Sequence, residues 1–136
     1  MNDQGRYEEA LEFDRRLLEI ARRGEVSPGK AADLSDWYGG KLYLLGRYEE
    51  ARDALIESLA IQEKCGFQRF SKYRMTIQRL ATVCDHLGRS EEAGMWRAKL
   101  EQVPPPATEV ERARLEAEAE RKPTARQYRS ADSIHH

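Results

Sequence analysis

Three residues that commonly bind metal ions follow one another at Cys84-Asp85-His86. Thiolate, imidazole and carboxylate groups all bind zinc, but the ligands of a zinc site must converge on one point. Consecutive side chains of a helix point in different directions, and no second cluster with ligand spacing accompanies these three. We therefore expect a packed cysteine beside an exposed aspartate and histidine, and we predict no metal-binding residues and no cofactor.

Other candidates for catalysis are Cys65, three Glu-Glu pairs and the final His135-His136. A reactive cysteine needs a neighbouring base, and the sequence places none beside Cys65. The Glu pairs follow glycines at a fixed distance, which is typical of acidic side chains in the first turn of a helix. The sequence holds no Ser-His-Asp set and no phosphate-binding loop. We expect no catalytic residues and hence no enzyme.

Aromatic and basic residues alternate in Phe67-Gln68-Arg69-Phe70-Ser71-Lys72-Tyr73-Arg74, a pattern that could stack single-stranded bases. The whole chain, however, has 23 Lys and Arg against 24 Asp and Glu, whereas nucleic-acid and membrane-surface binders carry a basic excess. The longest apolar run, residues 42–45, is too short to span a bilayer. With only two cysteines in 136 residues, we expect a cytoplasmic protein that binds neither nucleic acid nor membrane.

The elements that position these residues recur along the sequence. Three segments share five of six residues: Gly5-Arg6-Tyr7-Glu8-Glu9-Ala10, Gly46-Arg47-Tyr48-Glu49-Glu50-Ala51 and Gly88-Arg89-Ser90-Glu91-Glu92-Ala93. The second begins 41 residues after the first, and the third 42 residues after the second. Such a period indicates a solenoid of helical units. Each segment predicts a glycine turn followed by a helix with acidic residues in its first turn.

Packing roles follow from the same segments. We expect Tyr7 and Tyr48 to pack back onto a preceding helix, and Ala10, Ala51 and Ala93 to allow two helices to cross closely. Ser27-Pro28 reads as an N-cap followed by a first-turn proline. Helices are predicted at residues 7–22, 28–45, 48–64, 70–87 and 90–102.

These residues resemble the tetratricopeptide repeat, whose second helix begins with Gly-x-Tyr-x-x-Ala. The 42-residue period exceeds the usual one of about 34 and is similar to the variant in kinesin light chains. The resemblance implies an all-α solenoid of antiparallel helix pairs over residues 5–102. It comprises about two and a half repeats: a half repeat at 5–24, a repeat at 27–66 and a repeat in shifted register at 68–102.

Some positions depart from the family pattern. Asp14 and Arg97 stand where the second helix usually has a large apolar residue, and Ser35 and Ile77 replace an aromatic of the first helix. Residues 37–40 and 88–101 also resemble the last repeats of bacterial serine/threonine kinases with tetratricopeptide tails. No kinase motif is present in the sequence. One alternative is therefore that the chain is the C-terminal regulatory fragment of such a signalling enzyme.

The function implied by the resemblance is that of a non-catalytic protein–protein interaction module or scaffold. The first helix of each pair would line a concave groove that holds a peptide or a partner's helix. The small residues Gly39 and Ala81 set the register of these helices. The predicted groove positions are Asp33, Asp36, Gly40, Tyr43, Gln78, Arg79, Thr82 and His86.

The helix at 7–22 is the second helix of a repeat whose first helix is missing. Solenoid units bury their apolar faces on neighbours, and a single following helix pair cannot cover all of Leu11, Leu17, Leu18 and Ile20. We expect a longer array, a partner or a second copy to cover this edge. In the last case the protein would be a homodimeric scaffold that self-associates through residues 7–22.

The last part of the chain differs in composition from the repeats. Residues 103–122 read as a proline linker and a charged helix, which begins with a capping box between Thr108 and Glu111. We expect residues 123–136 to be disordered, because they lack the apolar residues that would bury against the array.

Overall fold

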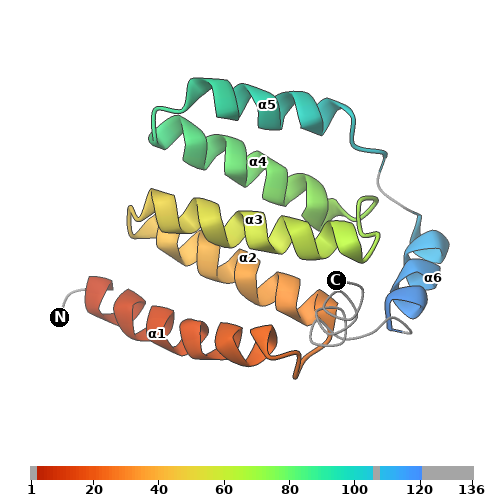
Figure 1. Cartoon of the computed structure of the whole chain (residues 1–136), viewed down its shortest axis with the longest axis horizontal. Helices are drawn as coiled ribbons and strands as arrows, with labels where there is room; N and C mark the ends of the chain where they lie inside the picture. The colour runs from red at the N-terminus through yellow and green to blue at the C-terminus, as the bar shows by residue number, and fades with distance from the viewer. Residues whose placement is uncertain (1–2, 106–107, 121–136) are drawn as a thin grey trace, which may run out of the picture.

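The computed structural model describes residues 3–105 and 108–120, which form helices and no strand. The helices are α1 (Asp3–Arg22), α2 (Pro28–Leu44), α3 (Tyr48–Lys64), α4 (Ser71–His86), α5 (Ser90–Glu101) and α6 (Glu109–Glu120). The pairs α2–α3 and α4–α5 are antiparallel hairpins stacked in chain order on α1, and α6 stands beside one end of the stack (Figure 1). The predicted all-α solenoid is thereby confirmed. The expected disorder of 123–136 falls outside the described residues.

Glycines with positive φ end the helices at Gly24, Gly46, Gly66 and Gly88. After Gly46 the amide of Arg47 donates to the carbonyl of Leu42 at 2.9 Å, a bond that closes the last helical turn. The same bond, also at 2.9 Å, recurs after Gly66 and after Gly88. These turns reverse the chain because glycine adopts left-handed φ without a Cβ clash.

The prediction of a turn at Gly5 is wrong. Helix α1 already begins at Asp3, so the chain is helical on both sides of Gly5 and does not reverse there. Tyr7 is 43% exposed, because no helix precedes it among the described residues for its ring to pack on. Tyr48 does pack on the preceding helix, with its ring 5.6 Å from that of Tyr43.

Helices α2 and α3 approach each other closely where they cross at Gly39. A Cβ added to Gly39 would lie 2.9 Å from Cγ of Leu55 and 3.3 Å from the carbonyl oxygen of Ala51. Ala51 is itself completely buried. Only a residue without a side chain fits at this point, so Gly39 fixes how closely the two helices pack.

Two buried serines hold the same helix pair together. Ser35 of α2 donates to the carbonyl of Ala54 at 2.6 Å, and Ser58 of α3 donates to the carbonyl of Ala32 at 2.9 Å. Both hydroxyls are fully buried and hydrogen-bonded, so neither incurs the cost of a buried polar group without a partner. Ser35, which replaces the aromatic residue of the family pattern, thus has a specific role in the hairpin.

The first contact of the stack, α1 on α2, depends on an ion pair. Asp14 is 7% exposed and pairs with Lys41 of α2. In the next repeat the corresponding residues are Leu55 and Val83, which both belong to the main apolar core. A buried ion pair in the α1–α2 contact therefore takes the place of an apolar contact in the α3–α4 one.

Helix α6 contacts the turn between α3 and α4. Its Ala119 is 9% exposed and clusters with Cys65 and Phe67. The amide of Glu111 donates to the hydroxyl of Thr108 at 3.2 Å, which is the N-terminal cap expected of that pair. Arg69, which the alternating aromatic and basic segment contributes, forms an ion pair with Glu111.

Gly39→Ala should destabilise the protein, because its methyl group would collide with Leu55 and the backbone of Ala51. We expect the free energy of unfolding to fall by about 1–3 kcal/mol. Gly40→Ala is the matched control, because a Cβ at Gly40 meets nothing within 4 Å. Replacing this helical glycine should raise stability by roughly 0.5–1 kcal/mol. Urea denaturation followed by circular dichroism measures both; equal effects would contradict the tight crossing.

Lys41→Val should leave the carboxylate of Asp14 buried without a counter-charge. We expect a loss of about 2–4 kcal/mol in the free energy of unfolding. Adding Asp14→Leu recreates the Leu–Val pair of the next repeat and should restore stability to within about 1 kcal/mol of the wild type. Urea denaturation of the two single variants and the double variant gives the coupling. If the double variant loses as much free energy of unfolding as the two single variants added together, Asp14 and Lys41 are not coupled.

Candidate functional site

A groove of about 520 Å³ lies between α2 and α4, the first helices of the two complete repeats. Gly39, Leu55 and Val83 contribute to its lining and are all buried. Three large apolar side chains also line it but remain exposed: Trp37 at 51%, Leu44 at 67% and Met75 at 46%. Large apolar side chains gathered around a hollow are typical of an interaction surface.

The groove includes most of the positions expected from the repeat register. The predicted residues that line it are Asp36, Gly40, Tyr43, Gln78, Arg79 and Thr82. Asp33 and His86 are not among its lining residues. The sequence analysis did not identify Trp37, Leu44 and Met75 as groove residues, although Trp37 and Leu44 lie seven residues apart on a helix and so share a face.

Asp36 does not face outward as predicted, because its side chain is only 2% exposed. Its carboxylate accepts a hydrogen bond from the hydroxyl of Thr76 at 2.8 Å and pairs with Arg79 at 2.5 Å. Both partners belong to α4, so this carboxylate binds α2 to α4. The positive charge of Arg79 at the edge of the groove is therefore paired with the carboxylate of Asp36.

A chain of buried polar groups continues from Asp36 into α3. The amide nitrogen of Gln62 donates to the hydroxyls of Ser58 and Thr76, each at 3.1 Å. Buried hydrogen bonds thus link α2, α3 and α4 to one another. Among the buried side-chain nitrogen and oxygen atoms of the described residues, only the amide oxygen of Gln62 has no hydrogen-bond partner.

The two predicted residues outside the groove make contacts of their own. The ring of His86 stacks on Tyr48 with centroids 4.7 Å apart, and its Nε2 lies 3.0 Å from the hydroxyl of Tyr43. Asp33 forms an ion pair with Lys72, whose ammonium also lies 6.0 Å from the centre of the Trp37 ring. These contacts join α2 to α4 beyond the groove.

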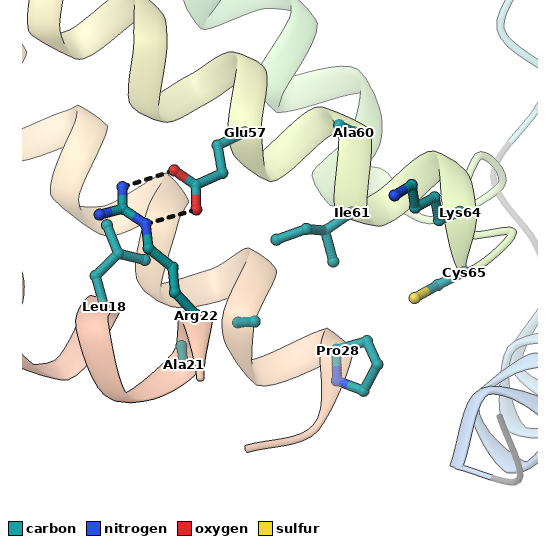
Figure 2. A pocket seen from close by; sticks show the side chains of 10 residues that line it. Leu18, Ala21, Arg22, Pro28, Glu57, Ala60, Ile61, Lys64 and Cys65 are labelled. Atoms are coloured by element: carbon teal, nitrogen blue, oxygen red, sulfur yellow. Dashed lines mark hydrogen bonds and ion pairs between the residues drawn. The ribbon is translucent and has the colours of Figure 1, made fainter. Parts of the chain in front are cut away.

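A second, smaller pocket of about 240 Å³ lies among α1, α2 and α3 (Figure 2). Its lining is mostly apolar and includes Leu18, Pro28 and Ile61. The guanidinium of Arg22 donates two hydrogen bonds to Glu57, at 3.0 and 2.8 Å, and so joins α1 to α3 beside it. These two polar groups of the pocket are thus paired with each other.

Cys84 and Asp85, which were considered for metal binding, are held in structural contacts, whereas His135 and His136 lie outside the described residues. Cys84 is fully buried, and this burial, followed by its hydrogen bond with Glu92, raises the pKa of the thiol. Asp85 is exposed, and its hydrogen bond with Arg97 lowers the pKa of the carboxyl. Residues 3–105 and 108–120 contain no group of three His, Cys, Asp or Glu side chains able to hold a metal ion. Nor is any helix in these ranges long and apolar enough to cross a membrane.

A family model of the tetratricopeptide repeat matches residues 1–24 and 42–65. Each matched segment contains the Gly-Arg-Tyr-Glu-Glu-Ala sequence and the second helix of a repeat, namely α1 and α3. The segment at Gly88, which has Ser90 in place of the tyrosine, lies outside both matches. No curated protein and no solved structure matches the chain.

The two matches, together with the all-helical fold, support a tetratricopeptide repeat protein. Repeats of this family generally mediate binding between proteins and are typically non-catalytic. The groove between α2 and α4 is consistent with that class of activity, since it offers apolar side chains rather than a set of reactive groups.

Cys84 should resist alkylation in the folded protein, because its thiol is buried and its raised pKa disfavours the thiolate. In a Cys65→Ser background, we expect iodoacetamide to modify Cys84 at least about a hundredfold more slowly in buffer than in denaturing urea. Ser90→Cys in the same background provides an exposed thiol as control. Peptide mass spectrometry measures both rates, and equally fast modification of the two thiols would contradict the structure.

Proposed function

We propose that this protein is a non-catalytic interaction module whose groove between α2 and α4 binds a segment of another protein through an apolar side chain. The observation that carries the proposal is the set of exposed apolar residues around the groove: Trp37, Leu44 and Met75. A few well-packed anchors supply most of the affinity of such surfaces, and aromatic residues are prominent among them.

The shape of the groove favours one bulky anchor. Gly40 lines the groove and leaves open space where another residue would place its Cβ. The neighbouring side chains of Gln78 and Thr82 on α4 are exposed. Their amide and hydroxyl groups are suited to hydrogen bonds with the backbone of a bound segment, while the anchor occupies the apolar part.

The charges beside the groove argue against an acidic ligand. Its two cations, Lys41 and Arg79, are each paired with a carboxylate of this chain, on Asp14 and Asp36. The charge of each cation is thus already offset within the chain, which weakens its attraction for a ligand carboxylate. The partner segment is therefore expected to be apolar at its anchor and uncharged around it.

The regulatory-tail alternative depends only on the resemblance of residues 37–40 and 88–101 to kinase tails, and it stays a prediction. It is compatible with the groove, because a regulatory repeat array would also act by binding a protein segment. The self-association alternative concerns a different surface, that of α1, and is argued separately below.

Gly40→Trp should fill the groove without unfolding the protein, since the position is open, and should prevent binding. Gly94→Trp on α5 is the matched control, because Gly94 is also helical and equally open but lies outside the groove. Peptides are first selected on the wild type from a random displayed library. Their Kd values are then measured for all three proteins by fluorescence polarisation.

Selected peptides should share one bulky apolar residue and should bind Gly40→Trp at least about tenfold more weakly than the wild type, while Gly94→Trp leaves their Kd unchanged. Trp37→Ala should also weaken them. Peptides that bind Gly40→Trp as tightly as the wild type would show that the groove is not the binding site.

A further inference from the structure

Helix α1 carries two stripes of mostly apolar residues, of which the rest of the described structure fully covers only one. The covered stripe consists of Leu11, Asp14, Leu18 and Ala21, all buried against α2. The second consists of Ala10, Phe13, Leu17 and Ile20 and is here named the outer stripe. Its spacing of three, four and three residues places its members on one helix face.

The other second helices show what normally covers the outer stripe. Counted from the repeated glycine, its equivalents in α3 are Ala51, Ala54, Ser58 and Ile61. Their burial is complete or nearly so except at Ile61, and Ser58 donates to the carbonyl of Ala32 on α2. The equivalents in α5 are Ala93, Trp96, Leu100 and Val103. Ala93 is fully buried, and the other three pack against the main core.

In both complete repeats, therefore, the face equivalent to the outer stripe packs on the first helix of the same hairpin. No such helix lies on α1 within the described residues. Phe13 is 63% exposed, and Ala10 and Ile20 are only partly buried. Leu17 is also partly buried, because one side of it packs against the apolar cluster between α1 and α2. The outer stripe is thus an apolar face shaped for one further helix.

Charges beside the outer stripe indicate the direction of that helix. On its free flank, the exposed acidic residues Glu9 and Glu12 lie in the N-terminal half, and the exposed basic residues Arg16 and Arg23 lie in the C-terminal half. Within one helix, Glu12 also pairs with Arg15 and Arg16. A second α1 laid antiparallel brings the same flank of both helices together, and so sets each acidic half against a basic half.

We propose that two copies of this chain associate through their outer stripes, with the two α1 helices antiparallel about a two-fold axis. Phe13 of one copy then packs on Leu17 of the second copy, and small Ala10 packs opposite large Ile20. Glu9 comes near Arg23 of the second copy, and Glu12 near Arg16. Such an interface is self-complementary, as two-fold symmetry requires.

The association goes beyond the proposed peptide-binding function and uses none of its residues, since the groove lies between α2 and α4. The two can therefore be tested separately. Sedimentation equilibrium of the full chain should give a mass of about twice the monomer's 15.7 kDa at micromolar concentrations, the range expected of a modest helix interface. A monomer throughout that range would overturn the proposal.

Phe13→Glu combined with Leu17→Glu should give a monomer whose helix content and binding of groove peptides are retained. Met95→Glu is the matched control, since Met95 on α5 is 71% exposed and lies away from α1, and it should remain dimeric. If Met95→Glu becomes a monomer while the Phe13 and Leu17 variant stays a dimer, the interface lies elsewhere and the proposal is refuted.

A charge exchange tests the antiparallel direction without altering the apolar stripe. Glu9→Arg alone and Arg23→Glu alone should each weaken dimerisation by about tenfold, because like charges then meet twice across the two-fold axis. The double variant Glu9→Arg with Arg23→Glu should restore it. A double variant weaker than both singles would rule out this pairing, even if the Phe13 and Leu17 variant fails to fold.

Discussion

The close crossing of α2 and α3 is the constraint on which the rest of the structure depends. Gly39 lets the backbone of Ala51 approach, and the hydroxyls of Ser35 and Ser58 tie each helix to the other's carbonyls. Because α2 also contacts α1 and lines the groove with α4, its position against α3 determines both surfaces. A wider crossing would move Trp37 and Leu44 relative to Met75 and alter the groove.

Buried polar residues, of which Asp14 and Ser35 depart from the family pattern, specify how the helices pair. Asp14 is paired with Lys41, Ser35 with the carbonyl of Ala54, and Asp36 with Thr76 and Arg79. Each group is buried, so an alternative register of its helix would leave it without a partner. For a buried charge, this loss costs several kcal/mol. An apolar pair such as Leu55 and Val83 tolerates sliding far better. The departures therefore add specificity to a fold whose repeats would otherwise be interchangeable.

Local signals account for what the sequence predicted well. The glycine at the end of a helix, the acidic first turn and the Ser27-Pro28 start each act within a few residues, so the bounds of α2 to α5 lie close to the expected ones. Exposure depends instead on which helix lies opposite. Asp36 is buried because Thr76 and Arg79 face it, and Gly5 fails as a turn because the helix already extends before it. Neither circumstance is visible in the residues around these positions.

The two edges of the stack differ in chemistry, and this difference explains why α1, not α5, is the edge suited to association. At α5, the positions equivalent to Leu11, Asp14 and Leu18 of α1 are Gly94, Arg97 and Glu101. All three are exposed, and Arg97 is neutralised by Asp85 of the neighbouring α4, so this face needs no further helix. A polar outer face is how terminal solenoid units remain soluble. The outer stripe of α1 has the opposite composition, with Phe13 exposed among aliphatic residues. In the proposed dimer, an antiparallel copy of α1 would cover this apolar face and would set the acidic half of its flank against the basic half of the other.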